Sequence, residues 1–306
     1  ELGIKESIVV NDRMETSVPD IYAAGDAVQV KHYVTGDDAL ISLAGPANKQ
    51  GRIIADNICG GDSRYLGSQG SSVIKVFDMT AATTGINETN AKKSGLDVDT
   101  VILSPMSHAG YYPGGKVMTM KVVFEKETYR LLGAQIIGYE GVDKRIDVLA
   151  TAIHAGLKAT QLKDLDLAYA PPYSSAKDPV NMAGFMIDNI AKGTLKQWHL
   201  EDMDKISKDK SVVLLDVRTV GEFNRGHMDG FRNIPVDELR ERINEIEKGK
   251  PVYLICQSGL RSYIASRILE GNGYETYNFS GGFRFYDAVV NDRALIERAY
   301  ACGMDY

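Results

Sequence analysis

The chain has 306 residues, with 44% hydrophobic residues, 25% charged residues and a formal net charge of −6. These proportions are typical of a folded protein and exclude a disordered or collagen-like chain. Acidic and basic residues are interspersed, so the sequence offers no basic patch for nucleic acid, and it holds no apolar run of about 18 residues that could span a membrane.

The cysteines and the N-terminus set the expected compartment. Cys59, Cys256 and Cys302 are too few and too scattered for a disulfide framework or a zinc cluster, so we expect free thiols and no metal site. The N-terminus lacks the charged and apolar regions of a signal peptide, which favours the cytoplasm. The chain begins with Glu1, and its first residues resemble the middle of a longer protein.

The N-terminal part of the chain predicts short strands and one helix. Residues 6–10 and 21–26 are β-prone. Apolar residues at helical spacing then predict a helix over residues 46–58, and the Gly-Gly pair that follows predicts where it ends. Cys59 comes directly after this apolar helix, and we expect it in the core.

The middle of the chain predicts an α+β module. Strict alternation over residues 117–124, followed by a polar turn, predicts a hairpin with residues 131–138. In chain order the expected elements are a strand over 72–78, a helix over 87–94, strands over 100–104, 117–124 and 131–138, and a helix over 143–155.

The pattern changes beyond residue 198. Residues 212–217 and 252–256 are continuous apolar runs, typical of parallel strands that are covered on both faces. Helical patterns over residues 237–247 and 261–271 follow these runs in turn. Strand and helix therefore alternate, which predicts a small α/β domain with a parallel sheet.

A short loop, Cys256-Gln-Ser-Gly-Leu-Arg-Ser, joins the second apolar run to the next helix. Loop amides and a helix N-terminus can point at the sulfur and stabilise a thiolate, a persulfide anion or an oxyanion. In this interpretation Gln257, Ser258 and Gly259 surround the substrate, and Arg261 adds positive charge. The alternative is a buried structural cysteine at the end of a strand.

The residues before the loop favour the chemical interpretation. They resemble the signature of the rhodanese (sulfurtransferase) family, in the segments Asp216-Val-Arg218, Glu222-Phe223, Gly226-His227 and Asn233-Ile234-Pro235. The resemblance covers residues 200–306 and implies that Cys256 accepts and donates sulfane sulfur, with Arg261 in its loop. It also implies that Asp216 and Arg218 support the loop and that His227 is structural.

Two further features of this domain stay open. Where the family usually has Gly-Gly followed by Trp, the chain has Gly281-Gly282-Phe283, which leaves the expected fold unchanged. Cys302 could resolve a persulfide on Cys256 as a disulfide, although its surroundings in the sequence favour an ordinary surface or tail thiol.

The N-terminal segment ending Ile-Tyr-Ala-Ala-Gly25-Asp26 resembles the second flavin-binding motif of the pyridine nucleotide–disulfide oxidoreductases. The resemblance implies that Asp26, at the end of a buried strand, accepts a hydrogen bond from FAD, with Gly25 allowing close approach. It also implies that a helix near Ala44 points its amides at the flavin. The alternative is an ordinary strand and turn with an exposed Asp26.

The rest of such a flavin site is not in this sequence. No Gly-x-Gly-x-x-Gly turn occurs for FAD or for NAD(P)H, and the redox cysteine expected near the family's N-terminus is also missing. The chain therefore resembles the C-terminal part of a longer flavoprotein. We do not expect this part alone to bind FAD tightly.

The segments 107–115 and 167–179 resemble coenzyme A-disulfide reductases within the same family. The resemblance implies a homodimer in which the phenols of Tyr111 and Tyr169 reach the flavin and cysteine site of the partner and donate hydrogen bonds to a thiolate. It further implies that Tyr173 contacts the cofactor, and that Lys177 and Asn48 bind the substrate, with Lys177 on a phosphate of coenzyme A.

The alternative for these tyrosines is interface packing, for which an apolar ring with a polar tip is well suited. Tyr112 competes with Tyr111 for the proposed role, and His108 is expected to support the loop rather than to act as an acid or base.

Three domains are therefore expected: the remnant of an FAD-binding domain over residues 1–69, a dimerisation domain over 70–197 and a rhodanese-like domain over 198–306. In the full-length protein they imply FAD- and NAD(P)H-dependent reduction of coenzyme A disulfide, a persulfide or polysulfide, with sulfur transfer through Cys256. The alternative is a sulfur-carrying or regulatory rhodanese module on an NADH oxidase.

Overall fold

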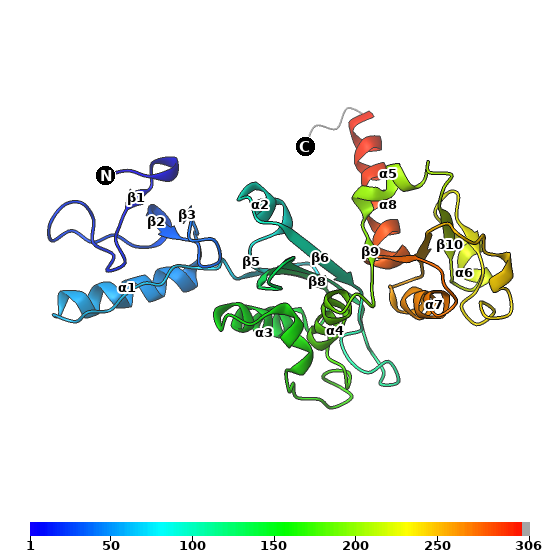
Figure 1. Ribbon diagram of the computed structural model, residues 1–306. Coiled ribbons are helices and arrows are strands. Elements are labelled where there is room, and N and C mark those ends of the chain that lie inside the picture. Colours follow the sequence, from blue (N-terminus) through cyan, green and yellow to red (C-terminus); the bar gives the residue numbers. More distant parts are fainter. Residues whose placement is uncertain (302–306) are drawn as a thin grey trace. The chain divides into compact units, whose positions relative to one another are not determined.

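The computed structural model describes residues 1–301, with the backbone alone for residue 291 and residues 293–301, so Cys302 lies outside the described residues (Figure 1). Close packing divides the chain into two compact units. The first joins Glu1–Thr100 to Val122–Lys158, and the second joins Val101–Lys121 to the chain from Ala159 onward.

The N-terminal segment forms a small sheet in the order β1-β2-β3. Its strands are β1 (Ile8–Val9), β2 (Val28–Lys31) and β3 (Asp38–Ala39), with short 3-10 helices at Ile4–Glu6 and Gly25–Ala27. The central strand, β2, runs parallel to β1 and antiparallel to β3.

The strand expected over residues 21–26 is wrong. Ala24 is extended, at φ −149° and ψ 170°, but only Tyr22 makes a ladder contact, an isolated bridge to Glu15. Asp26 therefore lies exposed in a 3-10 turn that precedes β2, and it does not follow a buried strand. The physical reason is that extended backbone becomes a strand only when a neighbouring strand takes its hydrogen bonds.

Helix α1 (Ala44–Ile58) confirms the helix expected in this part of the chain, and it begins two residues earlier than predicted. Its buried residues are polar, Gln50 and Asn57, whereas Ile58 is exposed. Cys59 is exposed as well, so its expected place in the core is wrong. The helix is held by apolar and polar contacts. Ile53 and Ile54 pack against the small core of Met14, Val28 and Val30, and the Gly25 amide donates to Gln50 Oε1 at 2.7 Å.

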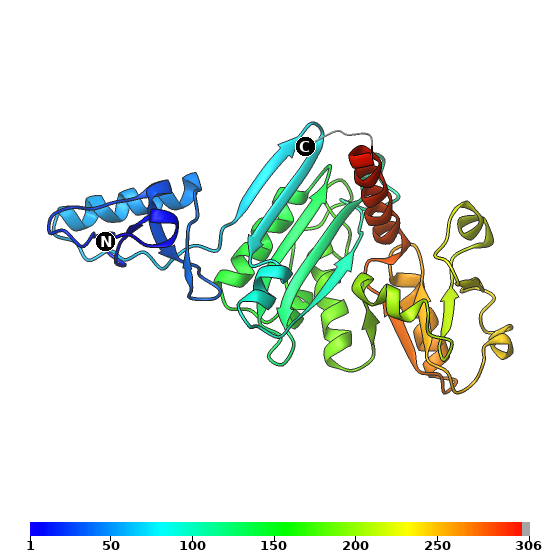
Figure 2. The same ribbon diagram turned by 90° about the horizontal axis from the view of Figure 1, so that it is seen from above.

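A five-stranded sheet in the order β4-β5-β8-β7-β6 forms the middle of the chain (Figure 2). The elements are β4 (Ser72–Val76), β5 (Met79–Gly85), α2 (Glu88–Lys93), β6 (Val98–Leu103), β7 (Met118–Glu125), β8 (Leu131–Gly138) and α3 (Val142–His154). The expected hairpin is confirmed as β7 and β8, and every strand and helix expected here is present within a few residues.

The sequence did not predict β5, which pairs antiparallel with β4 on one side and β8 on the other. Its residues, Met-Thr-Ala-Ala-Thr-Thr-Gly, lack the large alternating side chains that identify a strand. The strand exists because its two neighbours take its backbone hydrogen bonds. It ends at Gly85, where an added Cβ would lie 2.1 Å from the Leu132 carbonyl oxygen.

Helix α3 packs on β5 and β8, and it buries Ile146, Leu149 and Ile153. A second helix, α4 (Pro179–Ala191), packs against the 3-10 helix η3 (Ala159–Asp164) and was not predicted. Its start is specified locally, because Asp178 accepts a hydrogen bond from the Val180 amide at 3.0 Å and proline occupies the first turn.

The C-terminal part holds a five-stranded sheet in the order β11-β10-β12-β13-β9, with every pair parallel. This confirms the α/β domain that the sequence predicts. Its strands are β9 (Gln197–Trp198), β10 (Val213–Asp216), β11 (Arg232–Asn233), β12 (Val252–Ile255) and β13 (Thr276–Phe279). Its helices are η4 (Leu200–Asp202), α5 (Met203–Ile206), α6 (Val220–Arg225), η5 (Ile243–Glu245), α7 (Leu260–Glu270) and α8 (Gly282–Ala301).

The helix expected over residues 237–247 is wrong, because the segment forms turns and only the short 3-10 helix η5. The ion pairs of Arg242 with Glu238 and Glu245 form at helical spacing. The backbone nevertheless finds partners elsewhere: the buried Tyr274 hydroxyl donates to the carbonyls of Ile243 and Ile246 at 3.1 and 3.0 Å. Tertiary hydrogen bonds replace those of a helix here.

No helix among residues 1–301 is both long enough and apolar enough to cross a membrane.

One face of the middle sheet exposes an apolar row across three strands. Ile74, Ala81 and Ile137 lie beside one another on β4, β5 and β8, and Ile74 and Ile137 are 61% and 45% exposed. Helix α3 packs on β5 and β8, yet this row remains open to solvent. An exposed apolar row of this kind is typical of a protein–protein interface.

We expect Ile74→Glu to weaken self-association, because a carboxylate would have to be desolvated in an apolar contact. Light scattering coupled to size exclusion should give about twice the mass of one chain for the native protein and a lower mass for the variant. Lys75→Gln, on the next residue and the opposite face of β4, is the matched control. A native protein that is monomeric at all accessible concentrations contradicts this prediction.

Candidate active site

Cys256 lies directly after β12, a central strand of the parallel sheet, and its side chain is 1% exposed. Its Sγ accepts two hydrogen bonds of 3.1 Å, from the Gly259 amide and from the Ser262 hydroxyl. Gly259 has φ +99°, a conformation that favours glycine, and this turn directs the amide at the sulfur. A sulfur that receives two donors is suited to carry negative charge.

Ser262 is a residue of the candidate site that the sequence did not predict. It is fully buried on the first turn of α7, and its hydroxyl lies 3.1 Å from both Cys256 Sγ and the Gly259 carbonyl oxygen. A single hydroxyl proton serves one acceptor at a time, and an anionic sulfur is the stronger one. Its position could have been inferred from the sequence, because a hydroxyl six residues after the cysteine falls in the first turn of the helix that follows the loop.

The Gly281-Gly282-Phe283 segment holds the loop from the other side. The Phe283 and Arg284 amides donate to the carbonyls of Cys256 and Gln257 at 2.8 and 3.1 Å. Gly282 has φ +67°, and a Cβ there would lie 2.6 Å from the Ser258 amide nitrogen. This contact requires glycine, because any side chain would push the two segments apart.

The Asp216–Arg218 pair lies beneath the loop. Both side chains are buried, and they form a salt bridge of 2.6 Å. Arg218 also donates to the Gly226 carbonyl at 2.8 Å, stacks 3.8 Å from the centroid of the Phe283 ring and lies 3.5 Å from Gln257 Oε1. These contacts favour the supporting role expected for Asp216 and Arg218.

Arg261 is paired with Glu222 on α6 through two hydrogen bonds of 2.7 Å. The sequence suggested that Arg261 adds positive charge at the loop, and Glu222 offsets much of that charge. The hydrogen bonds from the Arg261 guanidinium lower the pKa of Glu222 to about 2. Thr219 donates to the same carboxylate from its amide and its hydroxyl at 2.9 Å, so the pair is fixed to the start of α6.

A cavity of about 420 Å³ opens beside the cysteine loop. It lies where the end of α6, the start of the loop and the first turns of α8 meet. Its lining is Arg218, Glu222, Arg225, Gly226, Gln257, Phe283, Arg284 and Asp287.

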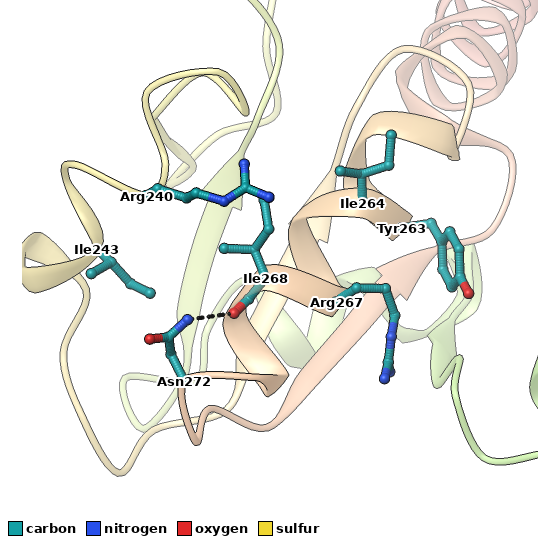
Figure 3. Close-up of a pocket in the computed structure, with 7 residues that line it drawn as sticks. All are labelled: Arg240, Ile243, Tyr263, Ile264, Arg267, Ile268 and Asn272. Carbon is teal, nitrogen blue, oxygen red and sulfur yellow. Dashed lines mark hydrogen bonds between the residues drawn. The ribbon is translucent and has the colours of Figure 1, made fainter.

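A larger cavity of about 500 Å³ lies along α7 beyond the loop (Figure 3). Ile264 and Ile268 form part of its lining together with Arg240 and Arg267. Cys256 itself lines neither cavity. Arg267 is engaged with Glu270 and with the Thr194 carbonyl. The smaller cavity is lined by Gln257, the residue after Cys256, and it therefore adjoins the cysteine loop.

Tyr111 and Tyr169 come together in the second compact unit. Their hydroxyls are 2.7 Å apart, and the side chains are 76% and 44% exposed. The hydrogen bond with Tyr111 raises the pKa of Tyr169, so this phenol stays protonated at neutral pH. Tyr112 instead packs edge-on against the buried His108 ring, with 5.5 Å between centroids, which favours Tyr111 over Tyr112 for the proposed role.

The remaining expected residues of this region are spread along the approach to α4. Tyr173 is exposed, and the Lys177 ammonium lies 5.9 Å from the centroid of the Phe185 ring. Asp178 accepts from Ser174 Oγ at 2.7 Å while it caps α4, which fixes this segment.

The N-terminal residues present part of a possible flavin surface. Gly25 has φ +77°, and an added Cβ would meet only the Ala47 Cβ, at 3.7 Å, so the backbone there is open to a close neighbour. Helix α1 begins at Ala44 without a side-chain cap, which leaves amides of its first turn for an acceptor. Asp26 and Asn48 are both exposed. This arrangement fits a contribution to FAD binding.

Among residues 1–301, no three His, Cys, Asp or Glu side chains gather in the manner of a metal site.

Replacing Ser262 should change the chemistry of Cys256 more than the fold. We expect Ser262→Ala to slow alkylation of Cys256 by iodoacetamide several-fold, because one of the two donors that stabilise an anionic sulfur is lost. Ser262→Thr, which keeps a hydroxyl, is the control. Equal alkylation rates in all three proteins would show that the hydroxyl does not act on the sulfur.

The Glu222–Arg261 pair should make stability depend on acid pH. A carboxylate whose pKa is lowered on folding stabilises the fold above its unfolded pKa, and that contribution is lost as the pH falls toward about 2. Trp198 is the only tryptophan and is buried, so its fluorescence can follow urea unfolding. The free energy of unfolding should therefore decrease between pH 5 and pH 2. Glu222→Gln should show a shallower pH dependence in that window, whereas Glu201→Gln should match the native protein.

Two family models match the chain. Residues 71–179 match the dimerisation domain of the pyridine nucleotide-disulphide oxidoreductases, and residues 199–288 match the rhodanese-like domain.

Known proteins resemble both parts. The chain is 39% identical over 187 residues to a coenzyme A disulfide reductase of Staphylococcus aureus, which covers 60% of this chain and 42% of that protein. The crystal structure of reduced CoADR-RHD from Bacillus anthracis matches with a TM-score of 0.92 and 46% identity, over 96% of this chain and 53% of that one. An NAD-dependent persulfide reductase from A. fulgidus matches with a TM-score of 0.85 and 41% identity, over 94% and 52%.

The chain spans about half the length of these relatives. Both matched solved structures extend across the middle sheet and the parallel sheet together, since they cover nearly the whole chain. Residues 71–179 of the chain therefore resemble the dimerisation domain of the pyridine nucleotide-disulphide oxidoreductases, and residues 199–288, which follow, resemble a rhodanese-like domain.

Proposed function

We propose that the C-terminal domain transfers sulfane sulfur through Cys256. The observation that carries this proposal is the pair of donors on the sulfur, the Gly259 amide and the Ser262 hydroxyl, each at 3.1 Å. The loop is also held from the start of α8, because the amides of Phe283 and Arg284 donate to the carbonyls of Cys256 and Gln257. A preorganised set of donors stabilises an anionic sulfur without reorganisation during the reaction.

The transfer takes two steps. The Cys256 thiolate attacks the outer sulfur of a donor persulfide, a new S–S bond forms, and the S–S bond of the donor breaks with its electron pair leaving on the donor thiolate. An acceptor thiolate then attacks the outer sulfur of the Cys256 persulfide, takes it away and regenerates the Cys256 thiolate. No net oxidation or reduction occurs in either step.

In the full-length protein we propose that this sulfur is delivered to a reductase site. NAD(P)H and a proton would reduce coenzyme A disulfide to two thiols, or coenzyme A persulfide to thiol and sulfide. FAD, when bound, supplies the transfer of two electrons from the nicotinamide to sulfur. Gly25, Asp26 and the amides at Ala44 would help to hold it. The names of the relatives, a coenzyme A disulfide reductase and a persulfide reductase, support this substrate class.

The paired phenols of Tyr111 and Tyr169 would serve the partner's site in a homodimer. One hydroxyl would donate to a thiolate, and the second hydroxyl would donate to the first. The pair can therefore stabilise negative charge on a leaving sulfur. Lys177, with Asn48, would bind coenzyme A, and Tyr173 would lie against the cofactor. The dimerisation-domain match and the exposed apolar row support the homodimer.

Cys256→Ser tests the sulfur transfer. We expect the 306-residue chain to convert thiosulfate and cyanide to sulfite and thiocyanate, and Cys256→Ser to lose this activity to background, since no other residue of the loop is a nucleophile for sulfur. Cys59→Ser, an exposed cysteine outside the site, is the matched control. Turnover that survives in Cys256→Ser would remove Cys256 from the mechanism.

The alternative is a rhodanese module on an NADH oxidase. The full-length protein, with the N-terminal half restored, distinguishes this alternative from the proposed reductase. The full-length protein with NADH should then reduce coenzyme A disulfide or persulfide without consuming oxygen. Rapid oxygen consumption with no response to either sulfur substrate would favour the oxidase instead.

A further inference from the structure

The cavity beside the cysteine loop contains two kinds of charged group. Arg218 is neutralised by Asp216, and Glu222 is neutralised by Arg261. Asp287, the other acidic residue of the lining, also has an interaction partner. Arg225 and Arg284 also line the cavity, and neither guanidinium has an ion pair or a side-chain hydrogen bond among the residues that the structure describes. They are therefore the two guanidiniums of the cavity whose donors no protein group in the described part of the chain takes.

The two arginines reach the cavity from different elements. Arg225 is the last residue of α6, and Arg284 lies in the first turn of α8. The Arg284 amide donates to the Gln257 carbonyl at 3.1 Å, which places the start of α8 against the residue next to Cys256. Both side chains line the cavity beside the cysteine loop, and both are exposed to solvent.

We propose that Arg225 and Arg284 form an oxyanion subsite that selects sulfur donors and acceptors carrying a phosphate or sulfonate group in addition to the reacting sulfur. Guanidinium groups bind such groups through paired hydrogen bonds, and phosphate and sulfonate share this geometry. A volume of about 420 Å³ is within the range of small-molecule sites and exceeds what thiosulfate fills. The cavity therefore also accommodates a larger phosphorylated thiol.

This subsite rests on the proposed sulfur transfer and makes it selective. The phosphates of a larger thiol lie away from the reacting sulfur, so they contribute mainly to substrate affinity and not to the chemical step. Loss of the arginines should therefore raise KM and leave kcat nearly unchanged. The attraction is also electrostatic at an exposed site, so it should weaken as salt is added.

Arg225→Gln, Arg284→Gln and the double variant test the subsite in the 306-residue chain. The substrates are coenzyme A persulfide, pantetheine persulfide, which has the same thiol arm without phosphates, and thiosulfate. We expect the double variant to lose about tenfold or more in kcat/KM for coenzyme A persulfide, through KM, and to stay within about twofold for pantetheine persulfide. In the double variant, the KM for coenzyme A persulfide should no longer depend on salt concentration.

The measurements with thiosulfate show whether the subsite binds a sulfonate or only a phosphate. A matching loss with thiosulfate assigns the subsite to the sulfonate as well, and no loss assigns it to the phosphates of a larger thiol. Arg240→Gln, an exposed arginine in the cavity of Figure 3, is the matched control and should behave as the native protein. The substituted side chains leave the amide of Arg284 in place, so the loop contact is kept.

The proposal is overturned if neither anionic substrate loses more than pantetheine persulfide does. That result, combined with an inactive Cys256→Ser, would leave the sulfur transfer intact and remove the subsite alone. Activity retained in Cys256→Ser would instead remove the transfer itself.

Discussion

The buried guanidinium of Arg218 connects the segments that make the candidate site. It pairs with Asp216 at the end of β10, accepts the Phe283 ring against its face and donates to the Gly226 carbonyl after α6. Removing a buried charge from water is costly unless its partners are in place, so the folded domain must keep these segments together. The cysteine loop rests on this arrangement through Gln257 and through the Phe283 amide on the Cys256 carbonyl.

This constraint explains how the domain holds a reactive sulfur without exposing it. The end of a central parallel strand places Cys256 at the edge where ligands bind in open α/β sheets. The glycine at position 282 lets α8 approach the loop, and the glycine at position 259 turns an amide onto the sulfur. Two ion pairs hold Arg218 and Glu222 in the wall of the cavity beside the loop, whereas Arg225 and Arg284 have no ion pair among the described residues.

Local patterns predicted most of the elements. The apolar runs at β10 and β12, the hairpin of β7 and β8, and helices α1, α3 and α7 all carried their signal in neighbouring residues. The strand β5 did not, because Ala, Thr and Gly form a strand only between two partners. Residues 237–247 carried a helical signal that Tyr274 overrides by hydrogen-bonding two of its carbonyls.

The sequence by itself determined which groups the chain carries, since each is a spacing of particular residue types: a cysteine loop that resembles the rhodanese type, Asp216 and Arg218 before it, and phenols at Tyr111 and Tyr169. The tertiary structure alone decided what surrounds those groups. It placed Ser262 on the sulfur, paired Arg261 with Glu222 and joined the two phenols over 58 positions of sequence. It also brought Arg225 and Arg284 to one cavity, because contacts between distant segments depend on packing that no local pattern encodes.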